Sequence, residues 1–465
     1  MRGWGRGAVV LIWATTAFAQ DLGDGHLGDL TVDTPLTVLN RDDLALSRDV
    51  KAGDTELPVG STLAYYPSTL LLMIRIRGGS ADGTESAQAG AAGDYFFTRI
   101  SHINLAGFEI SPALDRDWPA SDTEIISVPE YRNLTITSTG SVYAPNWNGA
   151  VGGVVAILVT DELKVDGTLN ADGIGFRGGV AGSAGIANGM GCMSPNEPAP
   201  NGAQKGEGLL SSASWANTLT GFGRNANGAG GGVCQSSGGG GGGNFGKGGS
   251  GGASTDGLRP VGGEGGAAVL TNGFKPLFGG GGGAGTRDSS GDGTSGGAGG
   301  GIVIVRAGHI SGSGIISARG ADALSGPPES PVNQGSPGGG GAGGSIDIVS
   351  ARSPTCHVSV KGGNGGLPAG GGGGGGRVRF SAPNSDGCTA ELFAGQGASS
   401  GDKQAQPQSP QAQGYMGTLV VETISTNMMN VPGRYEFRTF GCSSAGGGLG
   451  WLALVLLMKR RSARL

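Results

Sequence analysis

The chain has 465 residues, of which 101 are glycine and 14% are charged, and its formal net charge is −5. A glycine content this high without a strict three-residue period excludes collagen, and the lack of long segments with helical periodicity argues against an α-rich enzyme. Short β-branched segments between the glycine runs argue against a disordered chain. We therefore expect an all-β fold.

The first 19 residues predict a secretory signal peptide. Arg2 and Arg6 supply positive charge, residues 8–18 form an apolar core, and Ala17 and Ala19 are the small residues of a cleavage site. We expect cleavage before Gln20, and hence an exported protein.

Residues 20–128 predict a small N-terminal β domain. Strong strand patterns lie at 68–77, 95–103 and 108–114, separated by turn-rich segments. Three or more strands with an apolar face can fold as a barrel or sandwich of their own. A weaker strand-like segment at 30–39 is compatible with an opening coil of the repeats that follow.

Residues 129–435 predict a glycine-rich parallel β-helix, or β-solenoid. Similar units begin at Gly153, Gly301, Gly344 and Gly376, and a fragment begins at Gly417. Each unit reads as a short strand, a polar turn, a second strand and a glycine exit. Units that cannot bury a face alone, but can do so by stacking on their neighbours, are typical of solenoids.

The irregular spacing of these units leaves an alternative fold open. The last four starts are separated by 43, 32 and 41 residues. A jelly-roll-like sandwich joined to a bundle of polyglycine helices, as in the glycine-rich domain of certain receptor ectodomains, would also fit.

A glycine-rich excursion at 178–300 interrupts the predicted solenoid. Its few apolar residues cannot make a closed core. Either the excursion is mobile, or its glycine runs lie side by side as extended strands whose backbone groups bond each other.

Four of the five cysteines predict two disulfides, Cys192–Cys234 and Cys356–Cys388, which fits an exported protein. Cys356 and Cys388 occupy matching positions in consecutive repeats, and stacked coils lie about 4.8 Å apart, which is within reach of a disulfide. The cysteines show neither CxxC spacing nor nearby histidine pairs. We therefore expect no metal site and no cofactor.

Residues 436–465 predict a C-terminal sorting tail. Gly441 and Cys442 precede an apolar run at 449–458, which is followed by a cluster of basic residues. The run is shorter than the roughly 20 residues of a membrane-spanning helix. Residues 441–465 resemble the MYXO-CTERM sorting tail of myxobacterial surface proteins. The resemblance implies that the tail is removed, that Cys442 carries a surface anchor, and that the protein resides at the cell surface or outer membrane.

Removal of both terminal segments takes six basic residues and no acidic ones, which changes the net charge from −5 to −11. A surface this acidic repels nucleic acid and anionic lipid. The expected partners are polysaccharides or proteins of the envelope or the extracellular space, with membrane contact only through the tail.

Four aromatic residues, Trp118, Tyr131, Tyr143 and Trp147, gather within a short stretch. They predict either a sugar-binding face or a core cluster where the two domains meet, and the core is the favoured interpretation. No catalytic residues are predicted, because the nucleophile-elbow and metalloprotease motifs are absent from the sequence. The favoured function is structural or adhesive. The alternative is a polysaccharide-acting β-helix enzyme, which would need several acids or bases in one groove.

Overall fold

The computed structural model describes residues 22–423 except 36, 39–43, 63–64, 82–85, 182–201, 212–213, 215–218, 255–256, 287–292, 326–335 and 398–413. The fold is all-β, as expected, and the elements assigned among the described residues are strands together with the short 3-10 helix η1 (Ala120–Asp122). Within these residues, no helix has the length and the apolar character that crossing a bilayer requires.

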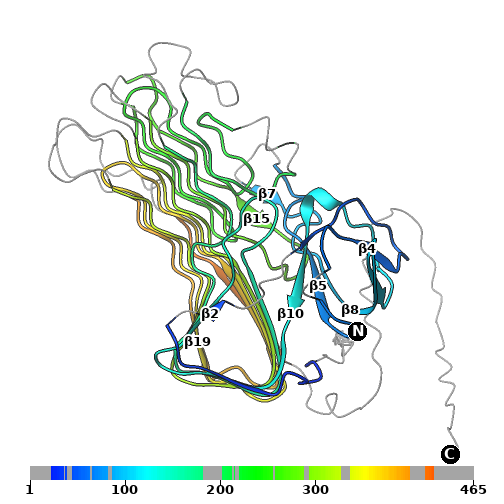
Figure 1. Ribbon diagram of the computed structural model, residues 1–465. Coiled ribbons are helices and arrows are strands. Elements are labelled where there is room, and N and C mark those ends of the chain that lie inside the picture. The colour runs from blue at the N-terminus through cyan, green and yellow to red at the C-terminus, as the bar shows by residue number, and fades with distance from the viewer. Residues whose placement is uncertain are drawn as a thin grey trace, which may run out of the picture.

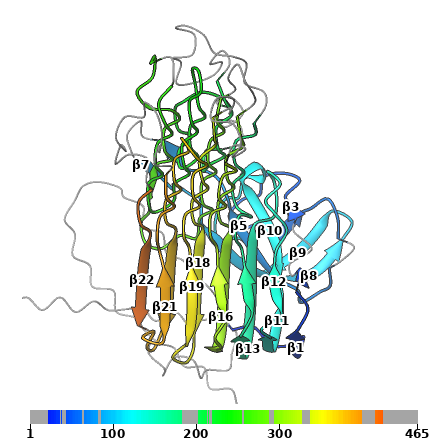
Figure 2. The same cartoon turned by 90° about the vertical axis from the view of Figure 1, so that its left-hand side faces the viewer.

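Two parallel sheets form a solenoid in which nearly every coil contributes one strand to each sheet (Figures 1 and 2). The seven-stranded sheet contains, in spatial order, β1 (Asp29–Val32), β11 (Glu130–Ile136), β13 (Val154–Val165), β16 (Ile302–Ser311), β18 (Ser345–Ser350), β20 (Arg377–Ala382) and β22 (Thr418–Thr423). The six-stranded sheet contains β2 (Thr37–Val38), β12 (Ser141–Tyr143), β14 (Thr168–Asn170), β17 (Ile315–Ser317), β19 (Cys356–Ser359) and β21 (Cys388–Glu391).

The solenoid core lies between these two sheets. Alternate residues of the long strands point inward and stack in register, so that Val303 lies beside Val155 on one side and Ile346 on the other. These three side chains and their counterparts across the core, such as Ile316 and Val358, are buried in one cluster. The period-two alternation in the sequence therefore gives each coil one apolar face, which the opposite sheet covers.

The first coil begins earlier than the predicted domain boundary. β1 pairs with β11, and β2 pairs with β12, so both strands belong to the solenoid sheets. The boundary that assigned all of 20–128 to a separate domain is therefore corrected. The strand-like segment at 30–39 is the opening coil, because Leu30 and Val32 occupy core positions of the seven-stranded sheet.

The remainder of this region forms a six-stranded antiparallel sheet. Its strands, in spatial order, are β3 (Leu44–Ala45), β10 (Thr123–Val128), β5 (Leu70–Arg75), β8 (Tyr95–Asn104), β9 (Gly107–Ser111) and β4 (Glu56–Pro58). One face, including Leu72 and Ile74, packs on the outer surface of β13 and β16 through Ala156 and Ile304. The opposite face forms its own core around Trp118. The seven-stranded sheet is thus a middle layer with an apolar core on each side.

A third small sheet ties the excursion to the N-terminal domain. It consists of β6 (Ser80–Ala81), β7 (Ser86–Gln88) and β15 (Ala268–Leu270). β15 lies in the glycine-rich excursion and pairs in parallel with β7.

Beyond the strands, the glycine runs form an ordered block, which we call the glycine lattice (Figure 1). In its centre, residues 238–243 donate and accept hydrogen bonds with a strict period of three. Successive amides of this run donate to residues 249–252, then 337–340, then 227–230, after which the order repeats. Successive carbonyls accept in the same way from residues 263–266, 371–374 and 280–283. This one extended segment is therefore hydrogen-bonded to six neighbouring segments of the same polypeptide. This period equals the three residues per turn of a polyproline-II-type helix.

At its closest contacts the lattice leaves no room for a side chain. A Cβ atom built on Gly240 would lie 2.3 Å from the carbonyl oxygen of Glu264, and one on Gly242 would lie 1.9 Å from that of Gly280. Of the two possibilities for the excursion, its described residues take the second, with extended glycine runs bonded side by side. The polyglycine helices of the alternative fold are present, but they extend a solenoid instead of a jelly roll.

Candidate functional site

A polar groove with a volume of about 910 Å³ lies where four successive coils leave the six-stranded sheet. Residues from the exits of β14, β17, β19 and β21 line it. Because the strands are in parallel register, side chains at equivalent positions stack in columns along the solenoid axis.

The first column contains Asp172, Arg319, Lys361 and Phe393, each two residues beyond a registered set of strand residues. Backbone hydrogen bonds continue the register there, since Gly320 donates to Lys361 and Gly362 donates to Phe393. The preceding residue in each coil is buried in the core or, for Leu392, packed against it, so the first-column side chains point outward.

The second column contains Asp322, Asn364 and Gln396, three residues farther along each coil. Asp322 Oδ1 accepts the backbone amide of Asn364 at 2.6 Å, and Asn364 Oδ1 accepts that of Gln396 at 2.9 Å. One side-chain oxygen of Asp322 and one of Asn364 therefore bind the backbone of the next coil. All three residues line the groove.

Arg319 braces the floor of the groove. Its Nε donates to Ser359 Oγ at 2.8 Å, and its Nη2 lies 3.5 Å from Glu391 Oε2. Asp172 Oδ1 accepts the backbone amide of Arg319 at 2.6 Å. Burial raises the pKa of Asp172 above its ordinary value, and the hydrogen bond from Arg319 offsets only part of that effect.

Two side chains of the groove have polar groups that are free to bind a ligand. Within the part of the chain that the structure describes, the Lys361 ammonium and the Gln396 side-chain amide form no hydrogen bond or ion pair. Phe393, at the end of the first column, is 53% exposed. The groove therefore offers a charged donor, an amide and an apolar ring to a ligand.

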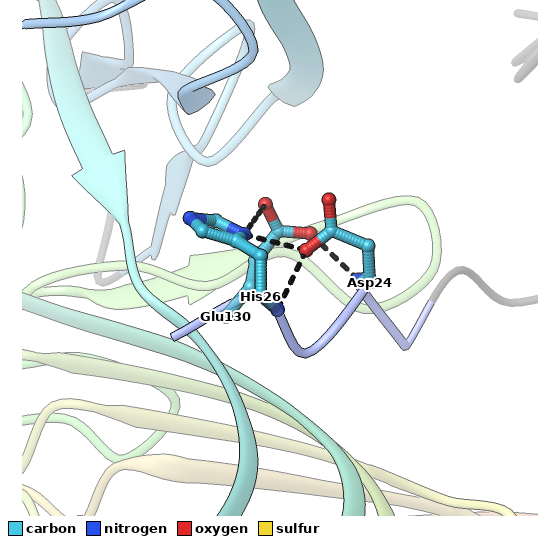
Figure 3. A group of neighbouring side chains, drawn as sticks. All are labelled: Asp24, His26 and Glu130. Carbon is cyan, nitrogen blue, oxygen red and sulfur yellow. Dashed lines mark hydrogen bonds and ion pairs between the residues drawn. The ribbon is translucent and has the colours of Figure 1, made fainter. Parts of the chain in front are cut away.

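A second polar cluster contains Asp24, His26 and Glu130 (Figure 3). His26 Nδ1 lies 2.5 Å from Asp24 Oδ1 and 3.8 Å from Glu130 Oε2. Burial by itself would raise the pKa of Asp24. The hydrogen bonds from His26 and the charge of Arg99 together have the larger opposite effect, so the pKa of Asp24 lies below its ordinary value. Carboxylates and an imidazole are the donor types of a metal site.

The Asp24–His26–Glu130 cluster is nevertheless arranged as an ion-paired clasp. Arg99, from β8, donates to both carboxylate oxygens of the buried Glu130, and the backbone amide of Asp24 adds a third bond. A metal ion would have to displace the guanidinium. The cluster instead fastens the start of the described chain and the N-terminal sheet to β11.

The four predicted aromatic residues do not share a face. Trp118, Tyr131 and Trp147 are buried, and each lies in a different core. Tyr143 is half-buried on β12. A sugar-binding face built from the four is therefore excluded, because three of them are buried in three different cores. Trp147 does lie where the N-terminal sheet meets the solenoid, packed against Phe176 and Phe278.

The disulfide predicted between Cys356 and Cys388 is confirmed. The two residues are neighbours in β19 and β21, with their Cα atoms 4.4 Å apart. Cys234 is also disulfide-bonded, and its predicted partner Cys192 lies outside the described residues. The predictions for Ala19, Gln20 and Cys442 fall outside them as well.

Sequence reasoning missed the groove. The signal is present, because in successive repeats the second residue after the short strand is Asp172, Arg319, Lys361 and Phe393. A comparison of repeats beyond their matching apolar residues would have found this polar column.

The fold and the groove define a β-solenoid protein that carries a glycine lattice at one end of its strands and polar columns on its outer surface. No protein-family model matches the chain, and no curated protein matches it at a significant level. Among solved structures, the chain is similar to the "Gp54 tailspike of Acinetobacter baumannii bacteriophage AP22 in complex with A. baumannii capsular saccharide", with 9% identity and a TM-score of 0.17. The alignment covers 80% of this chain and 64% of the tailspike, which is less than two thirds of its length. A likeness this weak identifies neither a family nor a ligand.

Proposed function

We propose that the protein is an exported structural or adhesive protein, displayed at the cell surface and retained there through its C-terminal region. The solenoid and its glycine lattice serve as a rigid platform that presents the outer face of the six-stranded sheet.

The observation that carries this proposal is the disulfide between adjacent coils. Disulfides form and persist in oxidising compartments and are rare in the cytosol. Cys356 and Cys388 join neighbouring coils, and Cys234 is bonded too. This agrees with the signal peptide and with the sorting tail that the sequence predicts.

Cell fractionation and intact-mass analysis test the proposal, with wild type compared with Cys442→Ala. We expect the mature wild-type protein to begin at Gln20, to lack the tail, and to carry added mass at Cys442. The variant should move to the medium, whereas Cys234→Ala, a matched cysteine change in the body, should stay at the surface. A cytoplasmic wild-type protein would contradict export. An unchanged tail and unchanged location in Cys442→Ala would contradict the anchor.

One observation supports a second function, a polysaccharide-acting enzyme. Asp172, Asp322 and Glu391 all line the groove, and burial raises the pKa of Asp172. Glycoside hydrolases use two carboxyl groups, one of which must hold a proton. Asp172 would be the acid, and Glu391 or Asp322 the base.

Release of reducing ends from neutral polysaccharides tests the enzyme hypothesis. If it is correct, wild type releases them and Asp172→Asn loses at least about 100-fold of the rate. Equal rates for the two proteins, or no release by wild type, would contradict it.

A further inference from the structure

We propose that the groove at the exits of β14, β17, β19 and β21 binds a neutral polysaccharide, whose chain runs along the solenoid axis. This inference rests on the adhesive form of the proposed function and assigns its ligand and its site.

The lining has the chemistry of a hydroxyl-rich ligand. A sugar hydroxyl both donates and accepts, so a binding site needs donors and acceptors close together. The Lys361 ammonium donates, the Asp322 carboxylate accepts, and the Asn364 and Gln396 amides do both. Among the described residues, neither Lys361 nor Gln396 uses its side-chain polar atoms elsewhere.

Phe393 supplies the apolar contact that sugar rings require. Sugars carry one face of C–H groups, which packs on aromatic rings. Phe393 is 53% exposed, although its position belongs to a column of otherwise polar residues. Gln396, three residues farther along the same coil, also lines the groove, so that an apolar and a polar side chain are offered by one coil.

The repeat of the columns matches the repeat of a polymer. Neighbouring coils lie about 4.8 Å apart, which is close to the length of one sugar ring. Asp322, Asn364 and Gln396 therefore present one polar group for each successive unit. A polymer aligned with the axis would contact several coils at once, which strengthens binding without any single strong contact.

The charge of the groove favours a neutral chain. Arg319 is held by Glu391, and Asp172 is held by the Arg319 amide. Besides these, the groove carries one further cation, Lys361, and one exposed carboxylate, Asp322, so that charges of both signs line it. A polyanion would meet the carboxylates, and a polycation would meet Lys361, so both are disfavoured relative to a neutral ligand.

Binding to immobilised polysaccharides tests the inference. The probes are neutral glucans, galactans and mannans, with polygalacturonate as the anionic comparison and chitosan as the cationic one. We expect the full mature chain to bind at least one neutral polymer. Phe393→Ala and the double variant Asn364→Ala/Gln396→Ala should each weaken that binding about tenfold.

Tyr66→Ala is the matched control, because Tyr66 is an aromatic residue, 72% exposed, in the N-terminal domain. It should bind like wild type. Tyr66→Ala and Phe393→Ala should unfold at the wild-type temperature, whereas the double variant also loses the bond from the Gln396 backbone amide to Asn364 Oδ1 and should unfold slightly below it, while staying folded at the assay temperature. Preference for a charged polymer, absence of binding to every neutral polymer, or wild-type binding by both groove variants would overturn the inference. Because the assay uses purified protein, these outcomes are independent of cell-surface location. An unanchored protein that still binds would contradict only the proposed display.

Discussion

Asp347 and Arg379 face each other on neighbouring strands of the seven-stranded sheet, with Arg379 Nε 2.8 Å from Asp347 Oδ1 and Nη2 2.6 Å from Oδ2. Tyr95, from the N-terminal sheet, donates its hydroxyl to Asp347 Oδ2 at 3.3 Å. The pair lies where the outer face of the middle layer changes from apolar β13 and β16 to polar β18 and β20. It therefore helps to fix how far the N-terminal sheet extends over the solenoid.

The Asp347 side chain is only 2% exposed, and that of Arg379 is 18% exposed. Burial is the largest single effect and lowers the pKa of Arg379, but the charge of Asp347, its hydrogen bond and the neighbouring Tyr95 and Glu422 together raise it by more, so the guanidinium stays charged. Asp347→Ala should lower the free energy of unfolding by about 3–5 kcal/mol, because it leaves a largely buried charge without its partner. Denaturant unfolding measures the loss.

Two further variants serve as controls for this pair. Glu422→Gln removes an exposed carboxylate 3.8 Å from the same guanidinium, and it should cost less than about 1 kcal/mol. Asp347→Leu/Arg379→Met removes both charges, and it should be more stable than Asp347→Ala. If Asp347→Ala unfolds at the wild-type denaturant concentration, the pair is not structurally important.

The disulfide Cys356–Cys388 should stabilise the folded state. It closes a loop with a sequence separation of 32 residues. A loop of this size corresponds to about 3.7 kcal/mol in the chain-entropy model. Cys356→Ser/Cys388→Ser should therefore unfold at a clearly lower denaturant concentration than wild type under oxidising conditions.

With a reductant present, the wild type should lose most of this advantage over the double variant, since both then lack this cross-link. An equal midpoint for the two proteins under oxidising conditions would show that adjacent coils are held without the disulfide.

Gly240→Ala should disrupt the glycine lattice. The added Cβ would lie 2.3 Å from the Glu264 carbonyl oxygen. Neither of the two segments in contact can move without breaking its hydrogen bonds to other segments of the lattice. We expect a loss of about 3 kcal/mol or more, at the upper end of overpacking effects. Thermal unfolding measures it.

Gly60→Ala is the matched control, because nothing lies within 4 Å of a Cβ at that position. It should change stability by less than about 0.5 kcal/mol. If both alanine variants melt alike, the lattice is looser than its hydrogen bonds indicate.

Asp29 should titrate well below an ordinary aspartate. Hydrogen bonds from Arg132 and Asn133 on β11 lower its pKa from 3.8 to about 2. A carboxylate whose pKa falls on folding stabilises the fold at pH values above its unfolded pKa. This contribution is lost as the pH drops from about 4 to about 2, so the attachment of β1 should weaken over that range.

Carboxyl-carbon NMR titration measures this pKa directly. Arg132→Gln should raise it towards 3.8, because the first of the two causes is removed. An unchanged titration midpoint in that variant, or a wild-type midpoint near 3.8, would disprove the hydrogen-bond explanation.

Local patterns predicted the solenoid, because alternating residues such as Ile346 and Ile348 indicate both a strand and its buried face. The disulfide between Cys356 and Cys388 followed from the same repeat alignment. The opening coil was harder to assign, because β2 is only two residues long. In addition, the whole N-terminal sheet lies in the sequence between β2 and β12, the strand with which it pairs.

The groove and the fate of the aromatic residues could not be predicted in this way. Trp118 and Trp147 are near in sequence, but they lie on opposite surfaces of the N-terminal sheet. Conversely, Asp172 and Phe393 lie in one groove although more than 200 residues separate them. Glycine runs carry no side-chain pattern, so the sequence left open whether they were ordered.

The glycine lattice also affects how stability responds to temperature. Exposing apolar groups on unfolding raises the heat capacity, whereas exposing peptide groups lowers it. Residues 238–243 are buried, and their contacts are almost entirely between backbones. Melting this part of the molecule therefore hydrates amides far more than hydrocarbon. Calorimetry should give a heat capacity change below about 12 cal/mol/K per residue, and the resulting shallow stability curve would keep the protein folded over a wide range of temperatures, including the cold.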